Sequence, residues 1–310
     1  FQFSGKYGAN LMEEVYRYAL VAGTVAKNNE FDVIHAHDWL TYSAGIVAKK
    51  ISGKPLIVHV HATEYDRGGE YNRNTLVYDI EKRGMEAADV VVTVSNWTRN
   101  IVIEKYGIPA EKVVTVHNAV DFKTDDQHKE ERGIKDKIVT FLGRITLQKG
   151  PEYFVEAAAK VMKRVPNVRF VMAGSGEKMN PLVRRVAQLG LGTRFHFTGF
   201  LRGNDVQRMF RYSDVYVMPS VSEPFGISPL EAMRSGVPTI ISKQSGVAEV
   251  LHHAIKVDYW DINALADAIY GVLAYPTLSN FMQREGYEEV NQLKWETASL
   301  KLKKIYESLM

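Results

Sequence analysis

The chain has 310 residues, about twice the typical domain length of about 150, and carries 39 Lys and Arg against 36 Asp and Glu. With 45% hydrophobic and 24% charged residues it should fold into two domains, which excludes a disordered or collagen-like chain. The net charge of +3 argues against a nucleic-acid partner, and the absence of cysteine excludes disulfides and thiolate chemistry. We expect a cytoplasmic protein whose anion sites are local.

Short β-branched runs alternate with longer amphipathic stretches, a pattern typical of β-α units and parallel sheets. The first part predicts four strands, at 31–35, 55–60, 89–94 and 113–116, and helices at 9–27, 40–50, 74–87 and 96–106. Doubly wound domains commonly have about six strands, so we expect the N-terminal domain, residues 1–122, to be incomplete at its start. The chain begins at Phe1, without an initiator Met, which fits such a truncation.

The polar segment 121–136, which includes KTDDQHKEER, predicts the domain boundary. After it, six strands are expected in a C-terminal domain, residues 123–290, at 137–141, 168–173, 194–198, 215–218, 239–242 and 254–257. Residues 291–310 have the spacing of one more amphipathic helix, which could pack on either domain. The predicted fold class is α/β, with two Rossmann-like doubly wound domains facing a cleft.

The segment from Glu223 to Glu231, EPFGISPLE, follows the expected strand 215–218 and opens a helix. Ser228 and Glu231 have the spacing of a capping box, which would make Glu231 structural. A capping box does not explain Glu223 or Gly226, whereas a glycine beside a helix start lets backbone amides approach an anion or polyol. Both interpretations remain open at this point.

The segment from Gly143 to Gly150, GRITLQKG, follows the expected strand 137–141. Arg144 offers a planar fork for phosphate oxygens and Lys149 a mobile positive charge, so the two could converge on one diphosphate. In the first domain, HAH at 35–37 and HVH at 59–61 each place two histidines on one face of a strand. Such a pair lacks the third and fourth ligands of a zinc site, so we expect no metal.

Several motifs in order resemble one known family. GR(x)4KG, AGSGE at 173–177, TGF at 198–200 and the E-x7-E of EPFGISPLE are similar to the donor domain of GT-B retaining glycosyltransferases of the glycogen and starch synthase branch. DVIHAHDW at 32–39, VHATEYDR at 60–67, VSNWT at 94–98 and VHNAVD at 116–121 resemble its first domain. The resemblance extends from about residue 31 to residue 295.

The resemblance implies roles for individual residues. Arg144 and Lys149 would bind the donor diphosphate, Glu223 would lie against the sugar, and His61 would face the reacting sugar; these four form the predicted catalytic set. Asp38 and Glu64 are expected on the acceptor side, with a helix cap as the alternative for Asp38. His59, deeper on the same strand face as His61, is expected to be either a satisfied core histidine or one that supports the residues contacting the sugar. The predicted donor-binding residues are Gly143, Gly174, Gly176, Thr198, Phe200, Leu201, Phe225, Gly226, Ile227, Ser228 and Glu231.

The expected function is retaining transfer of a hexose, glucose, from a nucleoside-diphosphate sugar to a saccharide acceptor, with an α-glucan as first choice. No D-x-D motif stands in the donor half, so neither metal nor cofactor is expected. Membrane contact would arise only if the acceptor is a glycolipid. Two alternatives remain open: a sugar-nucleotide binding module or inactive fragment lacking the N-terminal glycine-rich loop, and a GT-B-like epimerase. A phosphorylase would need a pyridoxal-phosphate lysine motif, which is not found.

Overall fold

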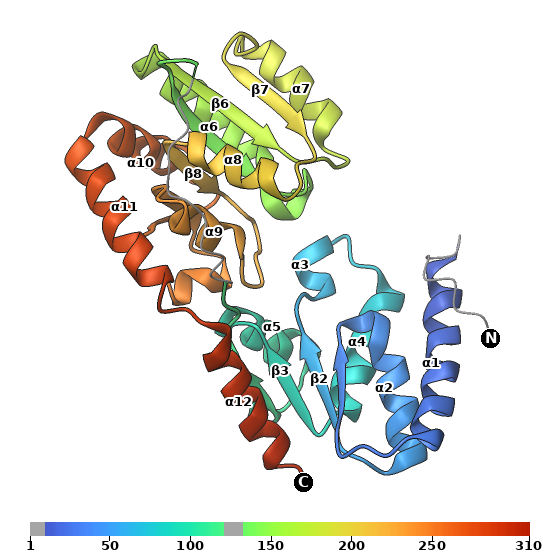
Figure 1. Cartoon of the computed structure of the whole chain (residues 1–310). Helices are drawn as coiled ribbons and strands as arrows, with labels where there is room; N and C mark the ends of the chain where they lie inside the picture. Colours follow the sequence, from blue (N-terminus) through green and yellow to red (C-terminus); the bar gives the residue numbers. More distant parts are fainter. Residues whose placement is uncertain (1–9, 121–132) are drawn as a thin grey trace. The chain divides into compact units, whose positions relative to one another are not determined.

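The computed structural model describes residues 10–120 and 133–310 (Figure 1). Most of the predicted linker, and the glycines at positions 5 and 8, lie outside the described residues. The chain divides into two units: unit 1 runs up to Asn118 and includes Glu296–Met310, and unit 2 is Ala119–Trp295. Within the described ranges no helix is both long and apolar enough to cross a bilayer.

Unit 1 is built on a parallel sheet of four strands, the number that the sequence predicted, and their order is β1-β2-β3-β4. Its strands are β1 (Ile34–His37), β2 (Leu56–Val60), β3 (Val90–Thr93) and β4 (Val113–Thr115). Its helices are α1 (Leu11–Asn28), α2 (Trp39–Ser52), α3 (Glu64–Gly68), α4 (Thr75–Ala87), α5 (Asn96–Tyr106), the short η1 (Ala110–Lys112) and α12 (Trp295–Glu307).

The first strand begins at Ile34, not at residue 31 as predicted, and continues to His37. Register explains the shift, because β1 pairs with β2 from Ile34 opposite Leu56 to His37 opposite His59. Backbone polar groups need partners, so the strand exists only where β2 supplies them. Both histidines of HAH therefore lie on the strand.

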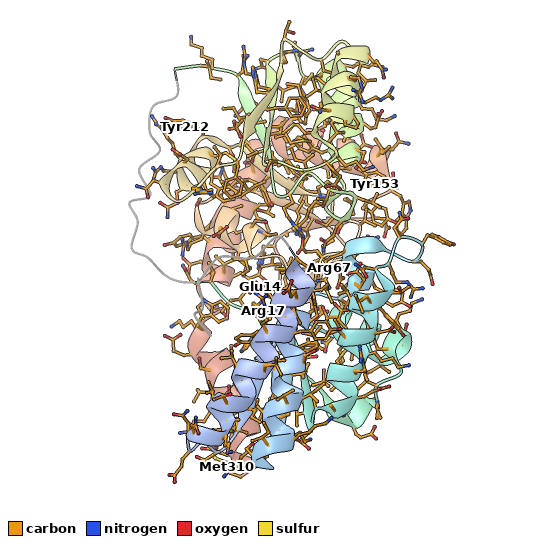
Figure 2. All side chains as sticks on the ribbon, turned by 90° about the vertical axis from the view of Figure 1, so that its right-hand side faces the viewer. Glu14, Arg17, Arg67, Tyr153, Tyr212 and Met310 are labelled. Carbon is orange, nitrogen blue, oxygen red and sulfur yellow. The ribbon has the colours of Figure 1, made fainter. Side chains whose placement is uncertain are left out.

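Each face of the unit 1 sheet is covered by helices. Residues from α2, α4 and α5, among them Tyr42, Met85 and Tyr106, pack with Val58 and Val91 into one core cluster. On the other face, the strands pack against residues of α12. The exposed surface of α1 carries an ion pair: Glu14 and Arg17 lie one turn apart, 3.5 Å between their charged groups (Figure 2).

Unit 2 contains a six-stranded parallel sheet with the order β10-β9-β8-β5-β6-β7, which confirms the second predicted series. Its strands are β5 (Lys137–Leu142), β6 (Val168–Ala173), β7 (Phe195–Gly199), β8 (Val215–Met218), β9 (Thr239–Ser242) and β10 (Ile255–Val257). Its helices are η2 (Leu147–Lys149), α6 (Pro151–Arg164), α7 (Met179–Gln188), α8 (Asn204–Tyr212), α9 (Ser228–Arg234), η3 (Gly246–Glu249), α10 (Ile262–Ala274) and α11 (Pro276–Val290).

The prediction of one helix over 291–310 was wrong at its start. Helix α11 ends at Val290, and α12 begins only at Trp295. The amides of Gln292 and Leu293 donate to carbonyls three residues back, at 3.1 Å each, which closes α11 with a tighter turn. Because α11 ends here, α12 is a separate helix, and it packs on the sheet of unit 1.

Candidate functional site

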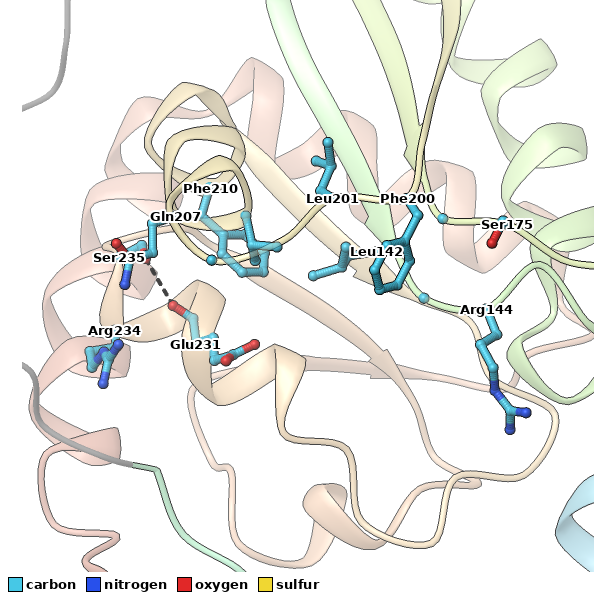
Figure 3. Close-up of a pocket in the computed structure, with 14 residues that line it drawn as sticks. Leu142, Arg144, Ser175, Phe200, Leu201, Gln207, Phe210, Glu231, Arg234 and Ser235 are labelled. Carbon is cyan, nitrogen blue, oxygen red and sulfur yellow. Dashed lines mark hydrogen bonds between the residues drawn. The ribbon is translucent and has the colours of Figure 1, made fainter. Parts of the chain in front are cut away.

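A pocket of about 590 Å³ opens in unit 2, past the carboxyl ends of β5, β6 and β7 and beside α8 and α9 (Figure 3). Ligands of open α/β sheets bind at this edge. Six residues that the sequence predicted for the donor line it: Gly143, Arg144, Gly174, Phe200, Leu201 and Glu231. Figure 3 shows Glu231 and Arg234 at one end of the pocket and Phe200 and Arg144 at the other.

The glycines beside the pocket let two loops approach each other. Gly174 has φ of 144°, and a Cβ on it would lie 1.8 Å from the carbonyl oxygen of Gly143. A Cβ on Gly176 would lie 2.3 Å from the carbonyl oxygen of Ile145. The amide of Gly143 donates to Ala173 O at 3.0 Å, which extends the ladder past the strand ends. These glycines therefore shape the wall, and Gly176 itself does not line the pocket.

Two side chains at one end of the pocket are open to solvent. Phe200 is 65% exposed, and the guanidinium of Arg202 lies 5.2 Å from the centre of its ring. Arg144 is exposed and donates from Nη2 to Gln148 Oε1 at 3.3 Å. An exposed aromatic face can stack on a planar ring, and a guanidinium can bind phosphate oxygens bidentately.

Glu231 lies on α9, and burial raises the pKa of its carboxyl, while Arg234 partly opposes the rise. The capping-box interpretation of this carboxylate was wrong. Helix α9 begins at Ser228, the preceding Ile227 has helical instead of extended dihedrals, and no side chain caps the helix. The Ser228 hydroxyl instead lies 2.8 Å from the Tyr216 hydroxyl. The Glu231 carboxylate therefore has no capping role and is available to bind a ligand in the pocket.

Lys149 and Glu223 form an ion pair between the loop after β5 and the loop after β8. Glu223 is 6% exposed and also accepts from Ser220 Oγ at 3.2 Å. The two loops are further joined by Val221 N, which donates to Gln148 O at 2.9 Å. The pair is part of the unit's framework, and neither residue lines the pocket.

The remaining predicted donor residues are not brought into this pocket. Thr198 is exposed, and its hydroxyl donates to Gly199 O at 3.0 Å. The Phe225 side chain is buried, and its carbonyl accepts from Val247 N at 2.7 Å. Gly226 has φ of 98°, a conformation that favours glycine, and Ile227 is exposed beside it. The loop from Phe225 to Ser228 thus lies outside the pocket wall.

In unit 1, His61 is held at two points by the end of β1. Its ring Nε2 lies 2.9 Å from His37 Nδ1. Its amide donates to Asp38 Oδ1 at 2.8 Å, and the amide of Ala62 does so at 3.3 Å. Asp38 stands at the predicted N-cap position of α2, but its carboxylate makes no capping hydrogen bond, so only the predicted cap was wrong. Its φ of 58° makes it the sole non-glycine with positive φ among the residues described, and it turns the carboxylate toward His61.

Of the two roles expected for His59, that of a satisfied core histidine was wrong. It is 5% exposed, yet neither ring nitrogen has a hydrogen-bond partner. Its ring stacks on His61 at 4.3 Å between centroids and on His35 at 5.3 Å. Burial and the neighbouring histidines lower the pKa of His59 to about 2 and that of His35 to about 4, so both rings are neutral at pH 7.

Glu64, predicted on the acceptor side, is 7% exposed. Its carboxylate accepts from Asn74 N at 3.0 Å and from Arg67 Nε at 3.0 Å. Arg67 (Figure 2) also pairs with Glu81, whose pKa burial raises to about 7, against the lowering effect of Arg67. Glu64 therefore belongs to a buried network that fixes α3 against α4.

Sequence reasoning missed several polar residues of the pocket: Ser175, Gln207, Arg234 and Ser235. Gln207 comes from α8, and Ser235 donates from its hydroxyl to Glu231 O at 2.9 Å. Ser175 lies within the AGSGE segment but was given no role, whereas the other three residues belong to no motif and are ordinary polar positions in the sequence. The available signals were the place of Ser175 directly after β6, and the place of the other three in or after the helices that follow β7 and β8.

Two family descriptions match the chain: Glycosyl transferases group 1 over residues 122–289 and Glycosyltransferase Family 4 over residues 10–124. An uncharacterized glycosyltransferase of Methanocaldococcus jannaschii is 33% identical over 241 residues, 74% of this chain and 62% of that protein. An alpha-maltose-1-phosphate synthase of Mycolicibacterium smegmatis is 28% identical over 88% of this chain and 78% of that protein. The chain thus spans less than two thirds of the archaeal relative.

Solved structures share the fold. A sucrose-phosphate synthase from Thermosynechococcus elongatus has a TM-score of 0.81 at 22% identity, over 100% of this chain and 85% of that one. HepE of Anabaena, solved in complex with UDP and glucose, has a TM-score of 0.81 at 20% identity, over 98% of this chain and 84% of that one. At these identities the likeness concerns the fold, which is the GT-B fold that the sequence predicted.

Proposed function

Because the chain belongs to the group 1 glycosyl transferases, we propose that it transfers a hexose from a nucleoside-diphosphate sugar to a saccharide acceptor. The donor sugar proposed is glucose and the acceptor an α-glucan. The support is that relatives of the chain include proteins named glycogen synthase and alpha-maltose-1-phosphate synthase, and that HepE was solved with UDP-glucose. We propose cytoplasmic transfer without a cofactor.

The observation that carries the proposal is the pocket of unit 2, which combines an acid, an exposed aromatic ring and a guanidinium in about 590 Å³. That volume fits a small-molecule site. In this proposal the Glu231 carboxylate accepts from the ribose hydroxyls, and Phe200 and Leu201 lie against the base. Arg144 binds the diphosphate. The glycines at 143 and 174 keep the wall free of side chains where the nucleotide lies.

The proposed chemistry follows from charge. The bond between the anomeric carbon and a diphosphate oxygen breaks, which leaves negative charge on the diphosphate and positive character on the sugar. Arg144 in the pocket wall, and Lys149 beside Gly143 of that wall, stabilise the departing diphosphate, so transfer needs no metal there. The acceptor oxygen bonds to the anomeric carbon on the face that the diphosphate leaves. The acceptor's proton passes to a diphosphate oxygen, and the configuration is retained.

Two further roles belong to this mechanism. Glu223, held by Lys149, lies against the hexose and accepts from its hydroxyls. His61, fixed by His37 and Asp38, faces the reacting sugar and donates to one of its hydroxyls. Both are polar groups oriented before substrate arrives, which lowers the cost of ordering them in the transition state.

A thermal-shift panel tests the donor site, with UDP, ADP, GDP and their glucose and mannose conjugates in the presence of EDTA. We expect one nucleotide series to raise the melting temperature of the wild type and of Glu288→Ala, an exposed control on α11. Glu231→Ala should lose the shift. The absence of a shift with every nucleotide would refute the donor site.

Turnover separates the enzyme from its alternatives. Nucleoside diphosphate release that depends on an added maltooligosaccharide, with elongation of that acceptor and unchanged anomeric configuration, supports retaining transfer. Binding without release indicates a sugar-nucleotide binding module. Release or isomerisation of the donor without any acceptor indicates an epimerase-like activity, and either result contradicts the proposal.

A further inference from the structure

Four imidazoles gather on one face of β1 and β2 in unit 1. Ring centroids lie 4.2 Å apart for His35 and His37, and 4.3 Å apart for His59 and His61. The parallel register sets His37 opposite His59, and residues two apart on a strand share a face. The sequence showed two separate pairs; the sheet joins them into a group.

Three of these histidines each offer a ring nitrogen, and the three nitrogens lie within 4.8 Å of one another: His35, His37 and His59. His35 Nε2 and both nitrogens of His59 are buried and have no hydrogen-bond partner. Buried polar atoms in folded proteins almost always have one. The unpartnered nitrogens therefore indicate a ligand with which they bond.

The second ring nitrogens of His35 and His37 each have a hydrogen-bond partner. His35 Nδ1 lies 2.6 Å from the Tyr306 hydroxyl of α12, and His37 Nδ1 lies 2.9 Å from His61 Nε2. Such contacts fix the ring orientation of metal-binding histidines and leave the opposite nitrogen as a ligand.

We propose that His35, His37 and His59 form a three-imidazole site for Zn²⁺, with a fourth position open. An all-imidazole set suits zinc and its transition-metal neighbours, and not Mg²⁺ or Ca²⁺, which prefer oxygen. Zn–N bonds of about 2.1 Å place tetrahedral nitrogens about 3.4 Å apart, so the rings must close slightly. His37 is exposed, so its ring can make this small adjustment while it keeps its contact with His61. A metal on His37 would also fix its contact with His61.

The test uses the untagged chain, stripped with chelator and titrated with Zn²⁺ against a chromophoric competitor. We expect one Zn²⁺ per chain, and Co²⁺ should give the visible absorption of a tetrahedral site. His37→Gln, an exposed position, and His59→Gln should each weaken Zn²⁺ binding more than 100-fold. Loss of an outer partner costs about 10–100-fold, so Tyr306→Phe should weaken it about 10-fold. His196→Gln, in unit 2, is the matched control and should bind as wild type.

Equal Zn²⁺ affinity in the wild type and His37→Gln would overturn the site, as would a loss of similar size in His196→Gln, since both indicate surface binding only. Circular dichroism checks the fold of each variant, and if His59→Gln fails to fold, His37→Gln and the Co²⁺ spectrum decide. No sugar nucleotide is needed, so the result is independent of the proposed transferase activity. Nucleotide shifts without Zn²⁺ binding would refute the metal site alone.

Discussion

Replacing Lys149 with methionine would leave the Glu223 carboxylate buried without its cation. The side chains of the pair are 22% and 8% exposed, so it is much less solvated than a surface ion pair. Removing one partner of a buried pair costs about 3–5 kcal/mol, whereas surface pairs contribute about 0–1 kcal/mol. Because Lys149 retains some solvent contact, we expect about 3 kcal/mol for Lys149→Met, the lower end of the buried range.

The converse change should cost less. In Glu223→Gln the ammonium of Lys149 can swing on its flexible stem toward solvent, so we expect a loss of about 1 kcal/mol. The double variant leaves no unpaired charge and should recover about 2 kcal/mol relative to Lys149→Met. Lys243→Met is the control, since its pair with Asp258 is 54% and 29% exposed and should contribute about 0.5 kcal/mol.

Native-state hydrogen exchange measures the loss of stability around the Lys149–Glu223 pair. The amide of Glu223 donates to Gln244 O at 3.0 Å, and the amide of Gly246 donates to Glu223 O at 2.8 Å, so both report on the loop that holds the carboxylate. A loss of about 3 kcal/mol corresponds to a fall in protection of about 100-fold. If Lys149→Met exchanges at those amides within threefold of Lys243→Met, the pair is solvated and the reasoning from its burial is wrong.

Three further predictions concern other parts of the two units. Gly174→Ala drives a Cβ to 1.8 Å from a backbone oxygen and should lower the melting temperature of unit 2 by more than about 6 °C, while Gly192→Ala, with open space, should not. Asp38→Ala should lower kcat for sugar transfer about 100-fold, because it removes the acceptor that holds the His61 amide. Asp38→Asn should retain most activity, since its side chain still accepts from that amide and tolerates positive φ. Equal losses of kcat in the two variants would contradict this. Burial raises the pKa of Glu81 from 4.5 to about 7, so between these pH values the folded chain binds a proton that the unfolded chain has released. The free energy of unfolding of unit 1 should therefore fall by on the order of 3 kcal/mol as pH rises through this window. Glu81→Gln should flatten the pH dependence of the free energy measured by urea unfolding, and an unchanged pH dependence would refute the assignment.

Much of the fold could be predicted because strand and helix signals are local. The strands at 168–173, 215–218 and 239–242 were predicted to the residue, since each is a short apolar run between turns. The start of β1 could not be predicted, because it depends on which residues of β2 are in register to hydrogen-bond with it. The break between α11 and α12 was hidden by the helical spacing of Leu293 with the residues after it.

The candidate site was predicted in part for the same reason. Motif residues that directly follow strands, such as Gly143, Gly174 and Phe200, reach the pocket because strand ends of a parallel sheet meet at one edge. Glu231 appeared in the sequence with a plausible capping role, and only the dihedrals of Ile227 removed it. Helix side chains such as Gln207 carried no signal, since their place in the wall depends on how α8 packs.

The sequence by itself determined that this chain is a two-part α/β protein, and its ordered glycines, Arg144 and the two glutamates at 223 and 231 identified the family. These features are local in sequence and need no folded context. Tertiary structure alone decided which polar groups lie together. Lys149 pairs with Glu223, the Asp38 carboxylate accepts from the His61 amide, and four histidines share one face. The physical reason is that strand register and loop approach set these distances, and both depend on partners far along the chain.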